Sequence, residues 1–377
     1  MTTPPSAANP APVDPAAAAT ARPPAKPRIA VWDNARFLLI VLVVIGHAIS
    51  TVRTDSQLGF ALYAYIYLFH MPAMILLSGL FSRPETTPKA IRSTIQLIVI
   101  WLTWEAIWAV IHFAVEGETP GQNFLVSPAW TLWFLVTLAT MRILLPYVAM
   151  LRRPLLFSIA VALGSSILPA IGTPFSASRT LAFLPFFVAG WLIRDRGWLD
   201  GQWFVRPSRK ALTAAWIGIA ALAAGFALSP GLRGFWRIDK WLTWRDDYAW
   251  LFRHAPIGDW APSQWIWTTL GGIAVAAVLM AVAAALTLAL LIVTPRGQSA
   301  MTAWGSRTLF VYLLHGPIIW VLRETGAIEW ANGLGWPGLL GIAAFAIALA
   351  VLLSLAWVPK AFGPIVEPRF DWVLRRS

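Results

Sequence analysis

Long apolar runs separated by short polar segments dominate the chain from Val31 onward. A bilayer core of ~30 Å is crossed by a helix of ~20 apolar residues, and backbone groups in lipid must be hydrogen-bonded within their own segment. The pattern therefore predicts an all-α, polytopic transmembrane helix bundle of about 10 spans. The expected spans are 31–52, 58–82, 90–115, 129–149, 154–172, 179–194, 211–228, 264–293, 307–323 and 335–359.

Lysine and arginine are unevenly divided between the two sides of these spans. With the N-terminus in the cytoplasm, 19 of the 29 Lys and Arg residues fall in cytoplasmic segments. Short segments on the other side hold only Arg53, Arg179 and Arg323, as the positive-inside rule requires. We therefore expect cytoplasmic N- and C-termini and a multi-pass protein of the inner (plasma) membrane.

The N-terminal segment differs from the rest of the chain. Residues 1–28 are mostly Pro and Ala, a composition that buries too little apolar surface to offset the entropy of ordering. We expect a disordered cytoplasmic tail at 1–28, then one transmembrane domain at 29–377 with a long extracytoplasmic loop at about 229–263. Five Trp residues of this loop either stack on sugar rings or form an interfacial belt: Trp236, Trp241, Trp244, Trp250 and Trp260.

Composition and charge narrow the possible chemistry. Apolar residues make up 58% of the chain and charged residues 12%, against about 25% charged residues in soluble domains. The chain has no Cys, which excludes disulfides, a thiol nucleophile and Cys-bound metals. The net charge of +12 is dispersed between apolar runs. We therefore expect the lipid bilayer, and no nucleic acid, as a partner.

The first expected span carries two ionisable residues, Arg36 and His47. Charges inside spans are costly and indicate function by default. The two residues are eleven positions apart, which places them on one helix face and about 16 Å apart along the axis. Arg36 is expected near the cytoplasmic end and His47 near the outer end. Alternatively, Arg36 extends to the interface and His47 makes a polar contact between helices.

Two further candidates lie in the second and third expected spans. His70 precedes Pro72, and a helical proline frees a backbone carbonyl, as is common where a helix lines a cavity. Glu105 is the only carboxylate deep in a span, at the expected depth of His47, and carboxylates commonly orient a catalytic imidazole. The alternatives are a packed imidazole beside a proline kink for His70, and a pairing with another helix for Glu105.

Arg179 and His315 complete the set of intramembrane candidates. Arg179 enters the sixth span from outside, so it needs an anionic or dipolar partner, such as Glu105 or a substrate oxygen, unless it extends to the interface. His315 adds a third imidazole within the ninth span. The histidines show no i, i+3 or i, i+4 ligand spacing, so we expect no metal.

Five sequence stretches, taken in chain order, resemble one known family. They are Arg36-x10-His47, Phe69-His70-Met71-Pro72 through Ser78-Gly79, Leu132-Trp133-Phe134-Leu135, Ser178-Arg179-Thr180 with Pro185-Phe186-Phe187 and Gly190, and Val311-Tyr312-Leu313-Leu314-His315. Over about residues 31–325 the chain resembles the integral-membrane acyltransferase-3 family, in particular its fucose 4-O-acetylase-like branch.

This resemblance implies an enzyme with a bundle of about ten helices. Such an enzyme moves an acyl group, usually acetyl, from cytoplasmic acyl-CoA to a hydroxyl of an envelope carbohydrate. The resemblance makes Arg36 and His47 the functional pair. Many members carry a further cation near the start of the first motif, where this chain has Asp33 and Asn34.

The residues and the resemblance together suggest a mechanism. We expect acetyl-CoA as the donor, a carbohydrate or glycolipid as the acceptor, and His47 as the general base or as the site of an acyl intermediate. Glu105 would orient His47, and Arg179 or His70 would stabilise the oxyanion. The CoA phosphates would bind the cytoplasmic cations Arg36, Arg83, Lys89, Arg92, Arg152 and Arg153.

Two alternatives to acetyl transfer follow from the same residues. A succinyl or other short acyl group in place of acetyl keeps the mechanism. A proton-coupled transporter or polysaccharide exporter also uses buried His, Arg and Glu residues. Dependence on acyl-CoA, as opposed to an ion gradient, distinguishes the enzyme from the carrier.

Overall fold

The computed structural model describes residues 29–117, 119, 121 and 123–370. Within these residues the regular elements are helices, and the only β pairing is an isolated bridge between Ile257 and Trp260. The predicted all-α class is confirmed. The expected tail at 1–28 lies outside the described residues.

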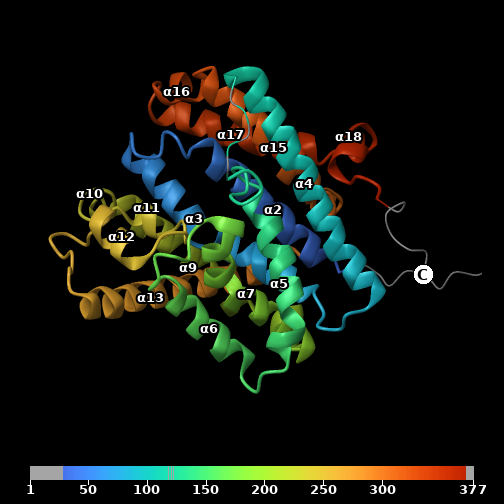
Figure 1. Cartoon of the computed structure of the whole chain (residues 1–377), viewed down its shortest axis with the longest axis horizontal. Coiled ribbons are helices and arrows are strands. Elements are labelled where there is room, and N and C mark those ends of the chain that lie inside the picture. The colour runs from blue at the N-terminus through green and yellow to red at the C-terminus, as the bar shows by residue number, and fades with distance from the viewer. Residues whose placement is uncertain (1–28, 118, 120, 122, 371–377) are drawn as a thin grey trace, which may run out of the picture.

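The longer helices form a bundle, shown in Figure 1. They are α2 (Ala30–Ala48), α3 (Gln57–Leu80), α4 (Pro88–Glu116), α5 (Trp133–Ala149), α6 (Pro154–Ser165), α7 (Ala177–Asp195), α9 (Arg209–Leu228), α13 (Trp265–Val293), α15 (Thr308–Glu324) and α17 (Trp336–Leu353). Short helices connect or flank them: η1 (Pro174–Ser176), α8 (Gln202–Val205), α10 (Gly231–Gly234), α11 (Ile238–Trp241), α12 (Tyr248–His254), α14 (Ala300–Gly305), α16 (Ala327–Asn332) and α18 (Val358–Val366).

Among the described residues, 7 helices are long and apolar enough to cross a membrane: α2, α3, α4, α7 with η1, α9, α13 and α17. The chain is therefore a multi-pass membrane protein. Three expected spans correspond to shorter helices, α5, α6 and α15. The 12 residues of α6 extend only about 18 Å at 1.5 Å per residue, less than the expected span 154–172. The count of ten and the orientation of the termini stay predictions.

Close helix packing holds the centre of the bundle. α3 contacts α2, α7, α9 and α13, while α2 also contacts α14, α15 and α17. At the crossing of α3 and α7, a Cβ at Gly79 would lie 2.0 Å from the carbonyl oxygen of Phe187, and a Cβ at Gly190 would lie 2.0 Å from that of Leu76. Small residues permit such close approach in membranes. The crossing fixes the two helices that carry His70 and Arg179.

A buried carboxylate organises the loop at 229–263. The Asp239 side chain is fully buried and accepts hydrogen bonds from Nε of Arg53 at 3.1 Å and Nε of Arg237 at 2.9 Å. The hydrogen bond to Asp239 raises the pKa of Arg237 above its ordinary value. The loop is thereby tied to the residues that follow α2.

The Trp residues of this loop differ in their surroundings. Trp241 is buried, and its Nε1 donates to the carbonyl of Ala255 at 3.0 Å. This side chain therefore supports the loop internally and is covered by protein. Trp260 is 44% exposed and packs edge-on against Phe252. Stacking on sugars stays a prediction for the exposed members only.

Candidate active site

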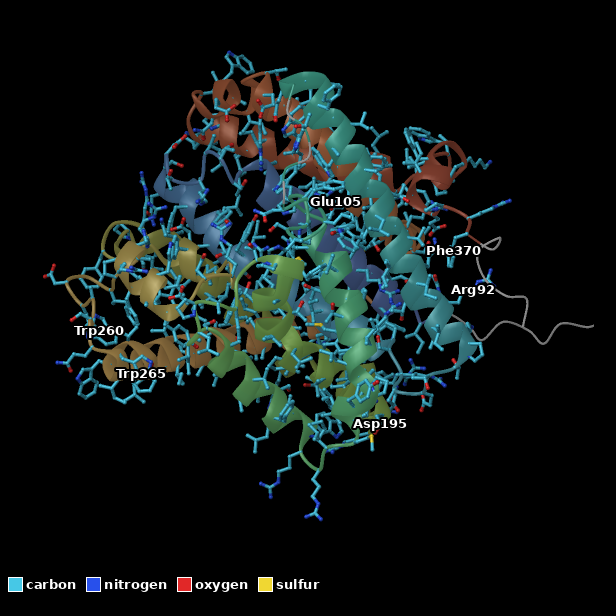
Figure 2. The ribbon with its side chains drawn as sticks, in the orientation of Figure 1. Arg92, Glu105, Asp195, Trp260, Trp265 and Phe370 are labelled. Carbon is cyan, nitrogen blue, oxygen red and sulfur yellow. The ribbon has the colours of Figure 1, made fainter. Side chains whose placement is uncertain are left out.

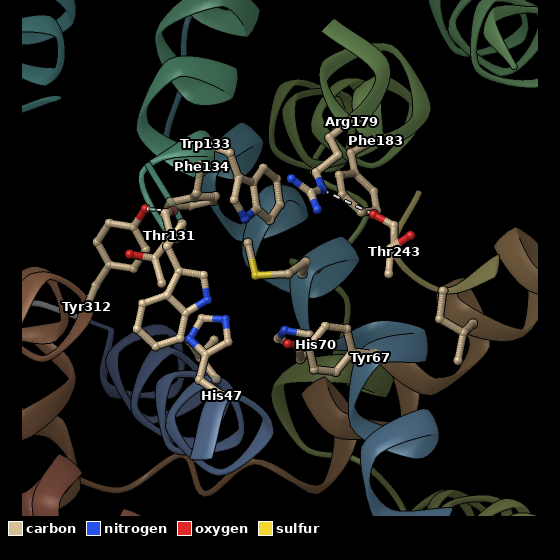
Figure 3. A pocket seen from close by; sticks show the side chains of 14 residues that line it. His47, Tyr67, His70, Thr131, Trp133, Phe134, Arg179, Phe183, Thr243 and Tyr312 are labelled. Atoms are coloured by element: carbon tan, nitrogen blue, oxygen red, sulfur yellow. Dashed lines mark hydrogen bonds between the residues drawn. The ribbon is translucent and has the colours of Figure 1, made fainter. Parts of the chain in front are cut away.

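One pocket lies where α2, α3, α5, α7 and α15 converge beside the loop that follows α11. Its volume is about 100 Å³. His47, His70, Arg179 and Tyr312 reach it from four helices, and Thr243 reaches it from the loop, as Figure 3 shows. We call it the His47 pocket. It brings together three of the predicted site residues, His47, His70 and Arg179.

His47 is hydrogen-bonded to a second histidine. Nδ1 of His47 lies 2.8 Å from Nε2 of His315, and the two rings are nearly parallel, with an interplanar angle of 5°. Nδ1 of His315 lies 2.9 Å from the carbonyl oxygen of Val311. A carbonyl only accepts, so Nδ1 of His315 carries a proton, and its Nε2 accepts the Nδ1 proton of His47. In neutral His47 the lone pair is then on Nε2.

Arg323 and Trp130 also contact His47. Arg323, on α15, donates through Nη2 to the carbonyl of His47 and, at 2.6 Å, to Oγ of Ser50. Its guanidinium lies 4.5 Å from the centroid of the Trp130 ring, which is 5.3 Å from the ring of His47. A cationic side chain that binds the last carbonyls stabilises a helix end. These contacts fix the C-terminal end of α2 and restrict the imidazole.

His70 lines the pocket as a hydrogen-bond acceptor. Its Nδ1 lies 2.7 Å from the carbonyl oxygen of Ile66, so Nδ1 carries a proton and Nε2 of the neutral ring carries the lone pair. The ring packs edge-on against Tyr67, at 4.9 Å between centroids. In this form Nε2 of His70 can accept a hydrogen bond from a hydroxyl or amide but cannot donate one to an oxyanion.

Arg179 brings positive charge to the pocket wall. Its Nε donates to the carbonyl of Thr243 at 3.1 Å, and its guanidinium lies 4.7 Å from the centroid of the Trp133 ring. Figure 3 shows the guanidinium between Trp133 and Phe183 at the edge of the pocket. The remaining N–H groups of the planar guanidinium are donors. Arg179 and His70 are the two residues predicted to stabilise the oxyanion. Of these, Arg179 has N–H groups that can donate a hydrogen bond to it.

Glu105 lies behind the pocket wall, and the structure does not join it to His47. Its carboxylate accepts from Nε1 of Trp101 at 3.0 Å and from the backbone N–H of Ala129 at 2.9 Å. The position beside Nδ1 of His47, expected for Glu105, is occupied by His315. The carboxylate instead anchors the residue before Trp130.

Arg36 and the predicted phosphate-binding cations lie away from the pocket. Arg36 donates to Asp33 at 3.0 Å, and its guanidinium lies 4.3 Å from the centroid of the Phe81 ring. Figure 2 shows Arg92 and Glu105 well separated along α4. Five candidates are exposed: Arg83, Lys89, Arg92, Arg152 and Arg153. They can meet a soluble donor, but they do not contact the reacting groups.

The sequence interpretation gave no specific role to two residues that the structure places at His47. His315 was visible as an imidazole inside a span, and Arg323 was one of the few cations expected outside the cytoplasm. Both signals mark a residue as unusual, but neither names its partner. No group of three or more His, Cys, Asp or Glu residues suited to a metal occurs in the described part of the chain.

Comparisons with known proteins give a family and a relative for this chain. The model of the acyltransferase-3 family, described as an acyltransferase domain, matches residues 29–355. Nodulation protein NolL of Sinorhizobium fredii (strain NBRC 101917 / NGR234) is 24% identical over 364 residues, which cover 88% of this chain and 89% of that protein. No solved structure matches the chain significantly. The family match includes every residue of the His47 pocket and the two histidines bonded there.

Proposed function

The chain belongs to the acyltransferase-3 family, and on that basis we propose that it transfers an acetyl group from acetyl-CoA to a hydroxyl of a carbohydrate. Membership and the apolar helices make it a membrane acyltransferase, so the carrier alternative is set aside. The observation that supports the proposed chemistry is the 2.8 Å hydrogen bond between His47 and His315. That bond leaves Nε2 of His47 as a base in the pocket.

In the proposed reaction, Nε2 of His47 takes the proton of the acceptor hydroxyl as its oxygen attacks the thioester carbonyl carbon. The C–S bond then breaks, and His47 returns the proton to the departing sulfur. The products are an ester and the CoA thiol. A positioned acid–base group of this kind contributes about 100- to 10,000-fold to the rate. His315, in place of Glu105, would orient His47 and stabilise its cation.

Arg179 and His70 would act on the other side of the reacting carbonyl. The negative charge that develops on the thioester oxygen needs fixed donors, and the N–H groups of Arg179 supply them. Nε2 of His70 would accept a hydrogen bond from the acceptor or from an amide of the donor. Arg179 is kept in place by the carbonyl of Thr243 and the ring of Trp133.

Donor and acceptor would approach from opposite ends of the bundle. Under the predicted topology in the inner membrane, the N-terminal end of α2 faces the cytoplasm. The phosphates of acetyl-CoA would bind there to Arg36 and to the exposed Arg83, Arg92, Arg152 and Arg153, because cations bind phosphate oxygens strongly. A carbohydrate or glycolipid acceptor would enter from the other side. The thioester and the hydroxyl would meet at His47.

The test uses the full chain in lipid nanodiscs with acetyl-CoA and a set of methyl glycosides. Released CoA is measured with a thiol reagent, which does not label the protein because the chain has no Cys. We expect His47→Ala to lower transfer by at least about 100-fold while acetyl-CoA still stabilises the protein in a thermal shift. Arg36→Ala should weaken that stabilisation.

The matched control for His47 is His254→Ala. His254 lies exposed on α12, and its Nδ1 donates to the carbonyl of Trp250. We expect it to keep the wild-type rate. Normal turnover by His47→Ala would overturn the assignment of the base. A wild-type protein that responds to neither acetyl-CoA nor succinyl-CoA would overturn the donor class.

A further inference from the structure

A second cavity lies beside α4 and is larger than the His47 pocket. Its volume is about 340 Å³, against about 100 Å³ for the His47 pocket. We call it the α4 cavity. Its side-chain walls include three residues of α4 and three of the connection to α5: Glu105, Trp108, His112, Asn123, Phe124 and Ser127.

The two cavities share a wall of aromatic rings and one backbone segment. The ring of Trp108, in the α4 cavity, lies 6.1 Å from the ring of Trp130, which in turn lies 5.3 Å from the ring of His47. Glu105 lines the α4 cavity and accepts the N–H of Ala129, the residue before Trp130. The rings of Trp108 and Trp130 therefore lie between the α4 cavity and His47.

The size of the His47 pocket limits what it can hold. Sites for small ligands commonly have volumes of about 300–1,000 Å³, and the His47 pocket is well below that range. It accommodates the reacting hydroxyl and the thioester group, so the remainder of the acceptor must lie elsewhere. The α4 cavity falls within the usual range and adjoins the pocket.

The lining of the α4 cavity matches an uncharged, hydroxyl-rich ring. Trp108 and Phe124 offer apolar faces, while Asn123 and Ser127 offer donors and acceptors. The Glu105 carboxylate is an acceptor with about four lone-pair positions, and its described partners are two N–H groups. Neither Lys nor Arg is among the described lining residues. A phosphate or carboxylate ligand would therefore meet Glu105 with no compensating cation of this kind.

We propose that the α4 cavity is a separate subsite that binds a neutral sugar unit of the acceptor, with Glu105 and Asn123 on its hydroxyl groups and Phe124 against its ring. This inference rests on the proposed function, since it names the acceptor class for the same reaction. Glu105 thereby receives a role in acceptor binding distinct from the orientation of His47.

The test measures sugar binding independently of catalysis. Full-length protein in nanodiscs is examined by saturation-transfer difference NMR with methyl glycosides of neutral hexoses and 6-deoxyhexoses, and with a methyl glucuronide as the anionic probe. We expect saturable binding of at least one neutral glycoside. Asn123→Ala and Phe124→Ala should each weaken it by roughly tenfold, the effect of losing one hydrogen bond or ring contact.

Matched controls separate a local effect from a general one. Phe157→Ala changes an exposed phenylalanine on α6, and Asn332→Ala changes a half-buried asparagine on α16 whose side chain donates to Asp55. Neither residue lines the α4 cavity, so both variants should bind like the wild type. His47→Ala should keep glycoside binding and lose transfer. Glu105→Gln retains the shape of the side chain. It should weaken glycoside binding more than it weakens acetyl-CoA binding.

The outcomes distinguish this inference from the proposed function. No saturable glycoside binding, equal binding of the glucuronide, or binding unaffected by both Asn123→Ala and Phe124→Ala would overturn the α4 subsite, even if acetyl transfer proceeds. Binding with the expected pattern supports the subsite. If such a protein never releases CoA from acetyl-CoA, the proposed reaction fails while the sugar site stands.

Discussion

Replacing His315 with leucine removes the acceptor that holds the Nδ1 proton of His47. In the structure this acceptor, Nε2 of His315, is 2.8 Å from Nδ1 of His47, and His315 is fully buried. Without it, the neutral imidazole of His47 is free to place its proton on Nε2, the atom that takes the hydroxyl proton in the proposed reaction. Leucine fills the apolar surroundings, so the loss is chemical and not one of volume.

The expected magnitude follows from the single bond that is lost. A hydrogen bond between neutral groups contributes about 0.5–1.5 kcal/mol, and the cation that His47 forms in the transition state gains more from the same acceptor, about 1.5–3 kcal/mol. The difference between the two, about 1–1.5 kcal/mol, corresponds to a decrease in kcat of roughly 5- to 10-fold. The KM for acetyl-CoA should change little, because His315 lies outside the expected phosphate-binding residues.

The assay compares His315→Leu with His315→Gln in nanodiscs, by the rate of CoA release at saturating acetyl-CoA. A glutamine side chain can place its amide oxygen near the former position of Nε2, so His315→Gln should recover much of the rate. His254→Leu is the matched control on α12 and should match the wild type. A wild-type kcat in His315→Leu, or equal rates in the Gln and Leu variants with unchanged thermal stability, would refute the reasoning.

Three further predictions test other contacts. Arg179→Lys should lower kcat by roughly 10- to 100-fold, because lysine cannot bind Thr243 and present a guanidinium to the oxyanion; an unchanged kcat would remove Arg179 from the mechanism. Gly79→Ala should destabilise the protein by about 1–3 kcal/mol through the contact with Phe187, whereas Gly218→Ala, with open space around it, should be neutral or stabilising in the same thermal melts. Asp239→Asn should cost about 1–3 kcal/mol. Because the pKa of Arg237 is raised, the ion pair is intact below the ordinary arginine pKa and is lost only as the pH rises through the higher pKa. The melting temperature of the wild type, measured from about pH 6 to 9, should therefore show no step from this pair.

Long apolar runs predicted the ends of two long helices well. The expected spans 58–82 and 264–293 differ by at most two residues at either end from the observed α3 and α13. The run 154–172 was wrong at its C-terminal end, because α6 stops at Ser165. Pro169 lacks a backbone N–H and restricts the residue before it. Hydropathy counts Pro169 and its neighbours as compatible with a span, whereas the structure forms turns there.

The candidate site shows what sequence periodicity cannot supply. The pattern placed His47, Glu105 and His315 inside spans, but residues at equal depth contact only if their helix faces meet. α15 packs against α2 and brings His315 to His47. The bonds of Glu105 run to Trp101 on its own helix and to the segment before α5. The choice between these partners depends on helix rotation and packing across 268 positions of chain, which no local pattern encodes.

Arg36 and His47 lie at a fixed distance on one helix but in different surroundings. Eleven residues of straight helix place the two about 16 Å apart, and α2 is continuous between them. Arg36 is 29% exposed in its side chain and paired with Asp33, whereas His47 faces a pocket of about 100 Å³. One residue therefore suits the charged end of a long donor, and the other suits its reactive end. If the proposed function holds, a rigid helix with both residues at a fixed distance would favour a donor whose anionic group and thioester are far apart, a condition that free acetate or a short acyl phosphate does not meet.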